Sequence, residues 1–556
     1  MQTNELKTKD NKDSGVAFMK NIPVLIIGGG PVGLSMALGL ARQNVRSLVI
    51  ERHPGITNHP RARGVNVRTM ELFRQWGNAI ELLKWELPKE ARRIIWVQSL
   101  QGEEVTRVIM DDSTTGIYSP AHASLVAQDR VEESLYHSLL DYKETEVQFL
   151  KECISFEENE CGIIAKILDR TNNHEELINA KYLIAADGAH SRIRKQLEIG
   201  MSGPDNLGQF CNVYCEFDIT QWTKHRPFIG MLFTDPSLSG RLIATVDGAN
   251  RWIVGMRFVS DNTKETFTDE YCINEIRRIT GVEDLSVNII NKNFWTMAAQ
   301  TANQYRKSRV FLAGDAAHRL PPTGGFGMNT GIQDSHNLAW KLAFVINNNV
   351  SDNLLDTYYE ERAPVAECNI KWSTENAARY DEINQAIRSG DTDTLKIKLH
   401  EQNNNLNYSG LDLGFIYHSR AIISESNQTL SVTPSEYAPT TLPGSRAPHV
   451  KLTKNGKTIS TLDLFEKNFV LLIGSEGERW RSVASELNQR FSFQIIVYKV
   501  ATDGDLIDLE NIWHHTYEIT TKGAVLVRPD GHVAWRSKSM PDNPAYELEK
   551  YFITIF

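Results

Sequence analysis

The sequence predicts an α/β fold in which a parallel-sheet domain is interleaved with an antiparallel sheet and followed by a smaller α/β domain. Three observations predict it. A strand, a glycine-rich turn, a helix and a second strand follow one another within residues 21–51. Two later apolar strands end in Asp-Gly and Gly-Asp, and short β-type runs fill the interval between them. The order of elements after residue 444 indicates one further small domain.

Length and composition limit the classes of protein. The chain has 556 residues, more than one hydrophobic core usually organises, so two or three domains are expected. Hydrophobic residues make up 41%, which suffices for a sizeable core. The formal net charge is −9 and no block of Lys and Arg occurs, so we expect no nucleic-acid partner. Residues 1–20 lack the apolar segment of a secretory signal and no run of 18 apolar residues occurs, which predicts a cytoplasmic protein without a membrane span.

The cysteines indicate neither a disulfide framework nor a metal site. Cys211 and Cys215 are four residues apart, but no second pair of Cys or His follows at the spacing that zinc requires. We therefore expect mostly structural thiols and no bound metal. The full set is Cys153, Cys161, Cys211, Cys215, Cys272 and Cys368.

The opening unit predicts a dinucleotide-binding, Rossmann-like domain. An apolar strand ends at Ile27, a helix extends through Ala41, and residues 47–50 form a second strand. Glycines between the strand and the helix bring backbone amides against a pyrophosphate, and the helix dipole adds positive potential there. The predicted contacts are Gly28, Gly30, Pro31, Val32 and Gly33.

The end of the second strand predicts a ribose contact. Glu51 follows Gly33 by 18 residues, where a carboxylate accepts hydrogen bonds from ribose hydroxyls, and Arg52 is the next candidate contact. FAD and NAD share the adenosine pyrophosphate, so this unit alone leaves the choice between them open.

Two later turns follow the same plan of an apolar strand that runs into a polar turn. Asp187 follows the strand at 182–185, and Gly314 and Asp315 follow the strand at 309–312. Asp315 is placed to hold a ribityl hydroxyl, and backbone amides at the start of the next helix would face negative charge on a reduced flavin. The candidates near that helix start are Pro322, Gly327, Met328 and Asn329. His318 suits either proton transfer or structural hydrogen bonding, so we name no catalytic side chain.

Together these three motifs resemble the group A flavoprotein monooxygenases, the family of para-hydroxybenzoate and phenol hydroxylases. The stretch from Gly314 to Lys341 is similar to this family nearly residue for residue, and the resemblance covers about residues 21–375. By this resemblance Arg63 and Gln128 match positions that touch the flavin. It implies FAD as the bound cofactor, a transiently bound NADH or NADPH, and O2 as co-substrate.

Residues 201–300 are expected to form an antiparallel sheet, and the resemblance implies that this sheet carries the substrate pocket. Charged side chains are scarce in its β-type runs, which favours an apolar aromatic ring as the ligand. Candidate walls of the pocket are Met231, Phe233, Trp252, Trp295, Tyr118 and Pro321, for each of which plain core packing is the alternative.

The resemblance implies single-component hydroxylation of a phenolic or polyketide-like ring through a flavin C4a-hydroperoxide, with a small aromatic molecule as the partner. Baeyer–Villiger or epoxidising chemistry on the same fold is the alternative within the family. An alternative of another class is a flavin-binding or ligand-binding protein without turnover. A monomer or a homodimer is expected.

The domains expected from the sequence are an FAD-binding domain in two segments, 21–200 and 301–375, a β-sheet substrate domain at 201–300, a helical connector at 376–440 and a last domain at 441–556. The last domain resembles the thioredoxin-like C-terminal domain of phenol-hydroxylase-type enzymes. It contains no cysteine, so we exclude a redox role for it.

Overall fold

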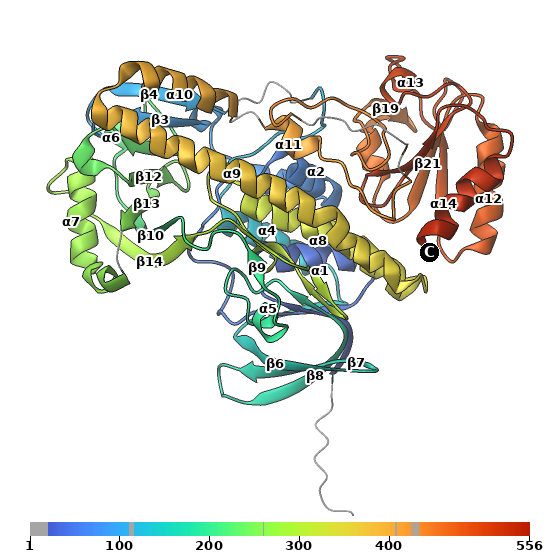
Figure 1. Ribbon diagram of the computed structural model, residues 1–556, viewed down its shortest axis with the longest axis horizontal. Coiled ribbons are helices and arrows are strands. Elements are labelled where there is room, and N and C mark those ends of the chain that lie inside the picture. Colours follow the sequence, from blue (N-terminus) through green and yellow to red (C-terminus); the bar gives the residue numbers. More distant parts are fainter. Residues whose placement is uncertain (1–19, 111–115, 259–260, 406–407, 424, 426–432) are drawn as a thin grey trace, which may run out of the picture.

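The computed structural model describes residues 20–110, 116–258, 261–405, 408–423, 425 and 433–556. Residues 1–19, on which the expectation of a non-secretory start rests, lie outside the described residues. Three lobes are visible in Figure 1: a sheet-and-helix lobe at the bottom centre, a β-rich lobe on the left and a red lobe formed by the end of the chain on the right. The predicted α/β class is confirmed.

The first lobe contains an eight-stranded sheet whose central strands are parallel. Six strands pair in the order β16-β17-β8-β1-β2-β5, and β6 and β7 extend β8 as an antiparallel branch. Val24 at the centre aligns with Ser47 on one side and with Tyr182 on the other. The strands are β1 (Lys20–Ile27), β2 (Ser47–Ile50), β5 (Thr145–Gln148), β6 (Lys151–Asn159), β7 (Gly162–Asp169), β8 (Glu175–Ala185), β16 (Arg306–Lys307) and β17 (Val310–Leu312).

Helices pack against this sheet and bury its apolar strands. The central helix is α1 (Pro31–Arg42), which begins at Gly30 with a proline in its first turn, a position where the missing N–H costs nothing. Gly39 of α1 lies so near α8 that a Cβ there would be 2.9 Å from the Cβ of Ala339. The helices that contact α1 are α8 (Phe326–Asn347) and α4 (Gln128–Leu139), and α2 (Val67–Trp76) and α3 (Ala79–Leu83) pack beside these two.

The second lobe is built on a seven-stranded sheet in the order β14-β10-β13-β12-β11-β3-β4. All pairs are antiparallel except β11 with β3. The domain boundaries predicted from the sequence assign β3 and β4 to the first domain. In the structure both strands belong to the second sheet, where β3 is the parallel partner of β11 although the two are far apart in sequence. The strands are β3 (Arg93–Val97), β4 (Glu104–Ile109), β10 (Gly208–Glu216), β11 (Gly230–Phe233), β12 (Arg241–Thr245), β13 (Arg251–Phe258) and β14 (Asn288–Met297).

The two faces of the second sheet differ in burial. The face that we call the outer face packs against α7 (Asp269–Thr280) in one apolar cluster that contains Val213, Val254 and Ile276, all at most 1% exposed. On the opposite, inner face, Leu232, Leu242 and other side chains remain half-buried. The inner face therefore keeps accessible apolar surface.

Long helices cross from one lobe to the other. Figure 1 shows α9 (Thr357–Ser389) running across the front of the molecule, and α10 (Thr392–Asn405) packs beside it near β4. The ring of Trp96 on the inner face stacks on Tyr380 of α9, with ring centroids 5.8 Å apart. None of the described helices is both long and apolar enough to cross a membrane. Shorter elements are α5 (Arg192–Gln196), α6 (Thr220–Thr223), α11 (Ser409–Leu413), β9 (Met201–Ser202), β15 (Gln300–Ala302) and β18 (His318–Arg319).

The last lobe is a four-stranded sheet in the order β22-β21-β23-β24, in which only β21 and β22 are parallel. Its likeness to thioredoxin stays a prediction. Trp340 and Phe344 of α8 pack on Phe469 of β21, so its core is continuous with that of the first lobe. The elements are β19 (Lys451–Lys454), β20 (Lys457–Ser460), β21 (Phe469–Ile473), α12 (Glu478–Arg490), β22 (Ile495–Lys499), α13 (Trp513–Thr516), β23 (Ala524–Val527), β24 (Val533–Ser537) and α14 (Pro544–Ile555).

Buried ion pairs join the last lobe to the first. Arg528, in the turn after β23, donates to both carboxylate oxygens of Glu361 on α9 at 2.6 and 2.8 Å. Lys341 of α8 donates to the same carboxylate at 2.8 Å, and all three side chains are fully buried. A second pair links Arg446 to Glu71 of α2. The last lobe is thus bonded to the helices of the first rather than tethered beside it.

Candidate functional site

Glycines shape the turn between β1 and α1. Gly28 has φ +111°, and a Cβ there would be 2.2 Å from the carbonyl oxygen of Ala186. A Cβ on Gly33 would be 1.9 Å from the carbonyl oxygen of Gly28. Gly30 differs, because no atom of the described residues lies within 4 Å of the position its Cβ would take. Gly28 and Gly33 therefore close the turn, while Gly30 borders open space at the start of α1. Pro31 and Val32 are half-buried in the first turn of this helix.

Glu51 lies where the sequence places it, at the end of β2 beside this turn. One carboxylate oxygen accepts the N–H of Gly29 at 2.7 Å, and the other accepts the N–H of His53 at 2.8 Å. The side chain is 9% exposed, whereas Arg52 is exposed to solvent. The backbone bonds fix the carboxylate at the edge of the glycine turn, the position expected of a ribose acceptor.

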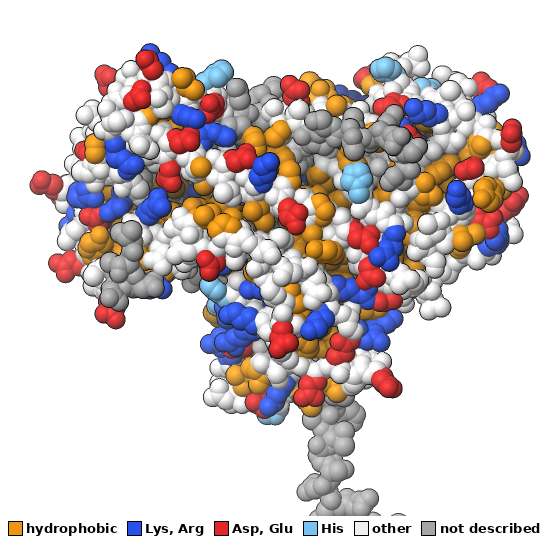
Figure 2. All heavy atoms as spheres, viewed as in Figure 1, with side chains coloured by type: hydrophobic (Ala, Val, Ile, Leu, Met, Phe, Trp, Pro, Cys, Tyr) orange, Lys and Arg blue, Asp and Glu red, His pale blue; other side chains and the backbone are white. Residues whose placement is uncertain are grey.

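Asp187 ends β8 next to the same turn. One carboxylate oxygen accepts the N–H of Arg192 at 2.8 Å, and the other is buried without a hydrogen-bond partner among the described residues. Cationic side chains lie nearby. The pKa of the neighbouring His190 is lowered, first by burial and then by the positive charges of Arg319 and Lys195. Figure 2 shows Lys and Arg side chains gathered on the lower lobe, beside α5 of Figure 1. The surface beside Asp187 and α5 therefore carries positive potential.

The Gly-Asp turn after β17 is packed against the first turn of α1. Gly314 has φ +60°, and a Cβ there would be 2.7 Å from Val32. The carboxylate of Asp334 on α8 accepts the N–H of Gly314 at 3.2 Å and is hydrogen-bonded to His318 at 2.6 Å and Arg362 at 2.8 Å. Burial raises the pKa of Asp334, but His318 and Arg362 outweigh it, so the net shift is downward. His318 thus has a structural partner, and Asp315 is exposed beside it.

The start of α8 is open and is tied to the Arg63 loop. Gly325, the residue before α8, has φ +71°, and neither Gly325 nor Gly327 has a described atom within 4 Å of its Cβ position. Asn329 donates to the carbonyls of Gly325 at 2.7 Å and Gly64 at 3.1 Å, and it accepts the N–H of Asn66 at 3.0 Å. Met328 is half-buried, Pro321 is buried and Pro322 is exposed. Free backbone N–H groups at this helix start face the open space.

Arg63 carries an uncompensated charge. Its Nε is buried and has no hydrogen-bond partner among the described residues, and burial lowers its pKa to about 10. No salt bridge with a carboxylate is made by Arg63 within the described part of the chain. The side chain as a whole is half-buried, so its charge is available to an anionic partner that the described part of the chain does not supply.

Gln128, the first residue of α4, is hydrogen-bonded to Glu132, a residue for which the sequence predicted no role. Its side-chain oxygen accepts the N–H groups of Arg61 at 3.1 Å and Ala62 at 3.3 Å, and its amide nitrogen donates to Glu132 at 2.8 Å. Glu132 is 1% exposed, and burial raises its pKa to about 7. Gln128 thus braces the loop that carries Arg63.

We expect Glu132 to make stability depend on pH. Between its ordinary pKa of 4.5 and the value of about 7 in the folded state, the folded protein holds a proton that the unfolded chain releases. The free energy of unfolding therefore falls as pH rises through this window, by roughly 3 kcal/mol from this group. Glu132→Gln should flatten that slope, measured by urea denaturation at pH 5 and 7.5. Glu133→Gln, which changes the half-buried neighbour, is the control, and an unchanged slope in Glu132→Gln would refute the assignment.

The inner face of the second sheet borders these elements. The ring of Tyr214 packs on His59, with ring centroids 5.9 Å apart, and with Ile253 it contacts Ala127, the residue before Gln128. Trp295 stacks on Phe210 across β14 and β10, with centroids 4.7 Å apart and both rings half-buried. The inner face thus meets the loop that carries His59 and Arg63.

Five of the six predicted pocket walls do not lie on the inner face. Met231, Phe233 and Trp252 are at most 4% exposed in the outer-face core, which packs against α7. Tyr118 packs edge-on against Tyr437, with centroids 5.3 Å apart, and its carbonyl accepts Arg446 at 2.9 Å, which places it at the last lobe. Trp295 lies on the inner face, and Pro321 lies in the loop before α8.

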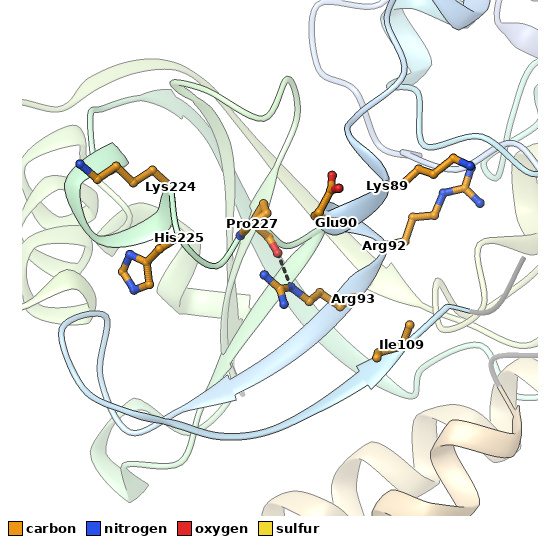
Figure 3. Close-up of a pocket in the computed structure, with 8 residues that line it drawn as sticks. All are labelled: Lys89, Glu90, Arg92, Arg93, Ile109, Lys224, His225 and Pro227. Atoms are coloured by element: carbon orange, nitrogen blue, oxygen red, sulfur yellow. Dashed lines mark hydrogen bonds between the residues drawn. The ribbon is translucent and has the colours of Figure 1, made fainter.

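A hollow of about 640 Å³ lies at the edge of the second sheet, apart from the predicted site residues (Figure 3). Arg93 donates to the carbonyl of Pro227 at 2.6 Å at its centre. Cationic side chains dominate its lining, which consists of Lys89, Glu90, Arg92, Arg93, Ile109, Lys224, His225 and Pro227. It contains none of the residues that the sequence predicts to bind a cofactor or a substrate.

The residues present fit FAD. The open Cβ positions of Gly30 and Gly327 leave room for a pyrophosphate at α1 and a flat ring at α8, the unpaired Arg63 offers a cation, and Glu51 and Asp187 offer oxygen acceptors. Among the described residues, no group of three or more His, Cys, Asp or Glu side chains converges as a metal site would require. Cys211 and Cys215 are buried in the outer-face core, and burial raises the pKa of both thiols.

Comparison with known families agrees with this arrangement. The FAD binding domain family matches residues 21–373, and the family of the C-terminal part of aromatic-ring hydroxylases matches residues 440–556. The first match covers both segments that contain the candidate cofactor contacts.

Individual relatives match nearly the whole chain. Tetracenomycin A2 monooxygenase-dioxygenase of Streptomyces glaucescens is 35% identical over 555 residues, covering 95% of this chain and 96% of the relative. The 4-methyl-5-nitrocatechol 5-monooxygenase of Burkholderia sp. is 32% identical over 545 residues, covering 95% and 96%. The crystal structure of the flavin-dependent monooxygenase PieE in complex with FAD and substrate superimposes with a TM-score of 0.89 at 29% identity, covering 96% of this chain and 99% of that one.

Proposed function

The chain belongs to the family of FAD-dependent aromatic-ring hydroxylases, and we propose that it hydroxylates a phenolic or polyketide-like ring with NAD(P)H and O2 in the space between the inner face and the start of α8. The observation that carries the proposal is the unpaired Arg63 beside open helix N-termini. This half-buried cation has no carboxylate partner among the described residues, so it is available to an anionic ligand in that space.

Each part of the site has a role in this proposal. The turn from Gly28 to Gly33 and the start of α1 bind the pyrophosphate, Glu51 with Arg52 holds the adenosine ribose, and Asp187 with Asp315 takes sugar and ribityl hydroxyls. Bound FAD supplies electron transfer from NAD(P)H and the activation of oxygen. Amides from Gly327 to Asn329 at the start of α8 stabilise negative charge on the ring, and Arg63 and Gln128 orient it.

The sheet supplies positioning rather than acid–base chemistry. Its inner face offers the half-buried Phe210, Leu242 and Trp295 against which an aromatic ring packs. A ring held there excludes water from the reacting carbon, and its orientation toward the flavin selects the position that is oxidised. We assign no side chain as catalytic base. We further propose that the enzyme acts as a monomer or a homodimer, which sedimentation would establish.

The proposal is tested with the purified protein. We expect a yellow protein whose oxidation of NADPH or NADH is stimulated by one class of ring compound, with a product heavier by one oxygen. The position of that oxygen separates ring hydroxylation from oxygen insertion beside a carbonyl. A colourless protein that does not take up FAD, or a yellow one whose reductant consumption no ring compound stimulates, would refute the proposal.

Removing the charge of Arg63 should have opposite effects on the cofactor and on the apoprotein. In Arg63→Met we expect FAD to bind about 10- to 100-fold more weakly, because a charged hydrogen bond contributes about 1.5–3 kcal/mol. The apoprotein should melt at a higher temperature, because the buried Nε, which has no hydrogen-bond partner among the described residues, is removed. Flavin fluorescence titration and thermal denaturation measure the two effects. Arg61→Met, at an exposed neighbour, should change neither, and equal FAD affinity in Arg63→Met would contradict the assignment.

A further inference from the structure

One side of α2 is bonded to the last lobe. Arg68 in the first turn of α2 donates to the carbonyl of Asp530 at 2.8 Å, and Arg74 in its last turn donates to the carboxylate of Asp463 at 2.9 and 3.0 Å. Other polar residues of the same helix face extend this contact. The residues of α2 that bond the last lobe are Arg68, Glu71, Arg74 and Gln75.

Another side of α2 is bonded to α8. Gln333 of α8 donates to the side-chain oxygens of Thr69 at 3.3 Å and Asn66 at 3.5 Å. Asn66 caps the start of α2 by accepting the N–H of Thr69 at 3.0 Å, and its own backbone N–H donates to Asn329 in the first turn of α8 at 3.0 Å. The helix α2 is therefore held between the last lobe and α8, with its first turn beside the start of α8.

A single turn of the last lobe contacts both helices. The backbone carbonyl of Asp530 accepts Arg68 of α2, and its carboxylate accepts the indole N–H of Trp340 on α8 at 3.2 Å. The carboxylate also accepts Nε of Arg528 at 3.1 Å. All four side chains are at most 5% exposed. The turn that carries Arg528 and Asp530 thus fixes α2 and α8 relative to one another.

The helix α2 begins where the Arg63 loop ends. Only residues 64–66 separate Arg63 from α2, and the backbone N–H and carbonyl of Val65 both pair with Ser124 at 2.8 Å. The carbonyl of Gly64 accepts Asn329 at 3.1 Å. A segment so short and so fully bonded transmits a displacement of α2 to Arg63, because packed protein interiors pass strain to their neighbours.

The contact between α2 and the last lobe is polar although it is buried. Glu71 is 5% exposed and accepts from Arg446 at 3.0 Å, from Arg68 at 2.9 Å and from Ser119 at 2.6 Å. Burial raises the pKa of Glu71, but the charges of Arg446 and Arg68 outweigh it and lower that pKa to about 2. Buried ion pairs add little stability compared with apolar packing, whereas hydrogen bonds fix directions. This contact therefore serves the position of α2 more than the stability of the fold.

We propose that the last lobe is a positioning part of the cofactor site, which holds Arg63 toward FAD by way of α2. Arg68 is the positioning residue that carries this effect, since it joins the turn of the last lobe to the first turn of α2. The inference rests on the proposed function and deepens it, because it gives a role in cofactor binding to a lobe that contains none of the predicted cofactor contacts.

The experiment uses the full chain purified with FAD and follows flavin release on dilution by its fluorescence. In Arg68→Met we expect the dissociation constant of FAD to rise about five- to tenfold and the visible absorption band of the bound flavin to shift. The double variant Arg63→Met with Arg68→Met should bind FAD no more weakly than Arg63→Met alone, because Arg68 acts through Arg63. A purely structural role of Arg68 would make the two losses additive.

Controls separate a displaced helix from a weakened fold. Leu487→Ala removes a buried side chain of α12, which packs against α14 and β22, and it should lower the melting temperature without changing the dissociation constant of FAD or the flavin spectrum. Arg68→Lys, which keeps a charge beside Glu71 but has one donor nitrogen, replaces an Arg68→Met that does not fold.

Three results would overturn the inference. They are wild-type FAD affinity in a folded Arg68 variant, an equal loss of affinity in Leu487→Ala, and additive losses in the double variant. A wild-type protein that does not take up FAD would instead refute the proposed function.

Discussion

Replacing Gly30 with tryptophan is expected to leave the fold intact and to abolish FAD binding. No described atom lies within 4 Å of its Cβ position, so the indole enters the space at the start of α1 without displacing the protein. That space is where the pyrophosphate must approach the helix amides. We expect the FAD affinity to fall by more than about a hundredfold, equivalent to about 2.8 kcal/mol. Flavin content after purification and fluorescence titration measure it.

Two comparisons make this result specific. Lys143→Trp places the same side chain on the exposed loop after α4, and it should keep full flavin. Gly33→Val should instead destabilise the protein, because its Cβ would be 1.9 Å from the carbonyl oxygen of Gly28. A Gly30→Trp protein that purifies with a full complement of FAD would show that the turn does not hold the pyrophosphate.

The second large effect is expected at Glu361. Glu361→Gln leaves the buried Arg528 and Lys341 without their shared carboxylate, and its amide nitrogen would face donors instead of accepting from them. Removing one partner of a buried ion pair costs about 3–5 kcal/mol. We therefore expect the free energy of unfolding, measured by chemical denaturation, to fall by about that amount.

The neighbouring residue offers a matched control. Glu360 pairs with Arg420, which is more than half exposed, so Glu360→Gln should cost less than about 1 kcal/mol. The double variant Glu361→Gln with Arg528→Met should recover part of the loss, because the unpaired guanidinium is removed. If Glu360→Gln and Glu361→Gln were equally stable, the buried network would not be what holds the last lobe.

The arrangement of the glycine turn and Glu51 was predictable because it follows from local backbone geometry. Gly28, Gly33 and Glu51 belong to one strand, turn, helix and strand that are continuous in sequence. The structure places Glu51 at the end of β2, beside the turn that Gly28 and Gly33 close. Asp334 and Glu132 were not predicted. Each is an acid within a helix whose partners, such as Gly314 and Gln128, become neighbours only after the chain folds.

The substrate side was less predictable because strand alternation does not reveal which face is covered. Met231 and Phe233 alternate correctly with Leu232, but only the packing of α7 decides that the first two are enclosed and Leu232 faces inward. The contribution of β3 and β4 to the same sheet was equally hidden. β4 pairs with β3, and the other partner of β3, β11, lies more than a hundred residues further along, so no local pattern connects them.

The shared carboxylate of Glu361 also has a consequence for biosynthesis. Arg528 follows Glu361 by 167 residues, so the ribosome adds Glu361 to the nascent chain long before it adds Arg528, the partner of its carboxylate. During that interval α8 and α9 of the nascent chain lack the partner that lets them bury Lys341 and Glu361 together. Chaperone engagement should therefore persist until the final strands are translated. Messenger RNAs whose coding sequence ends within the last lobe should yield polypeptides that proteases degrade, rather than shorter proteins that bind FAD.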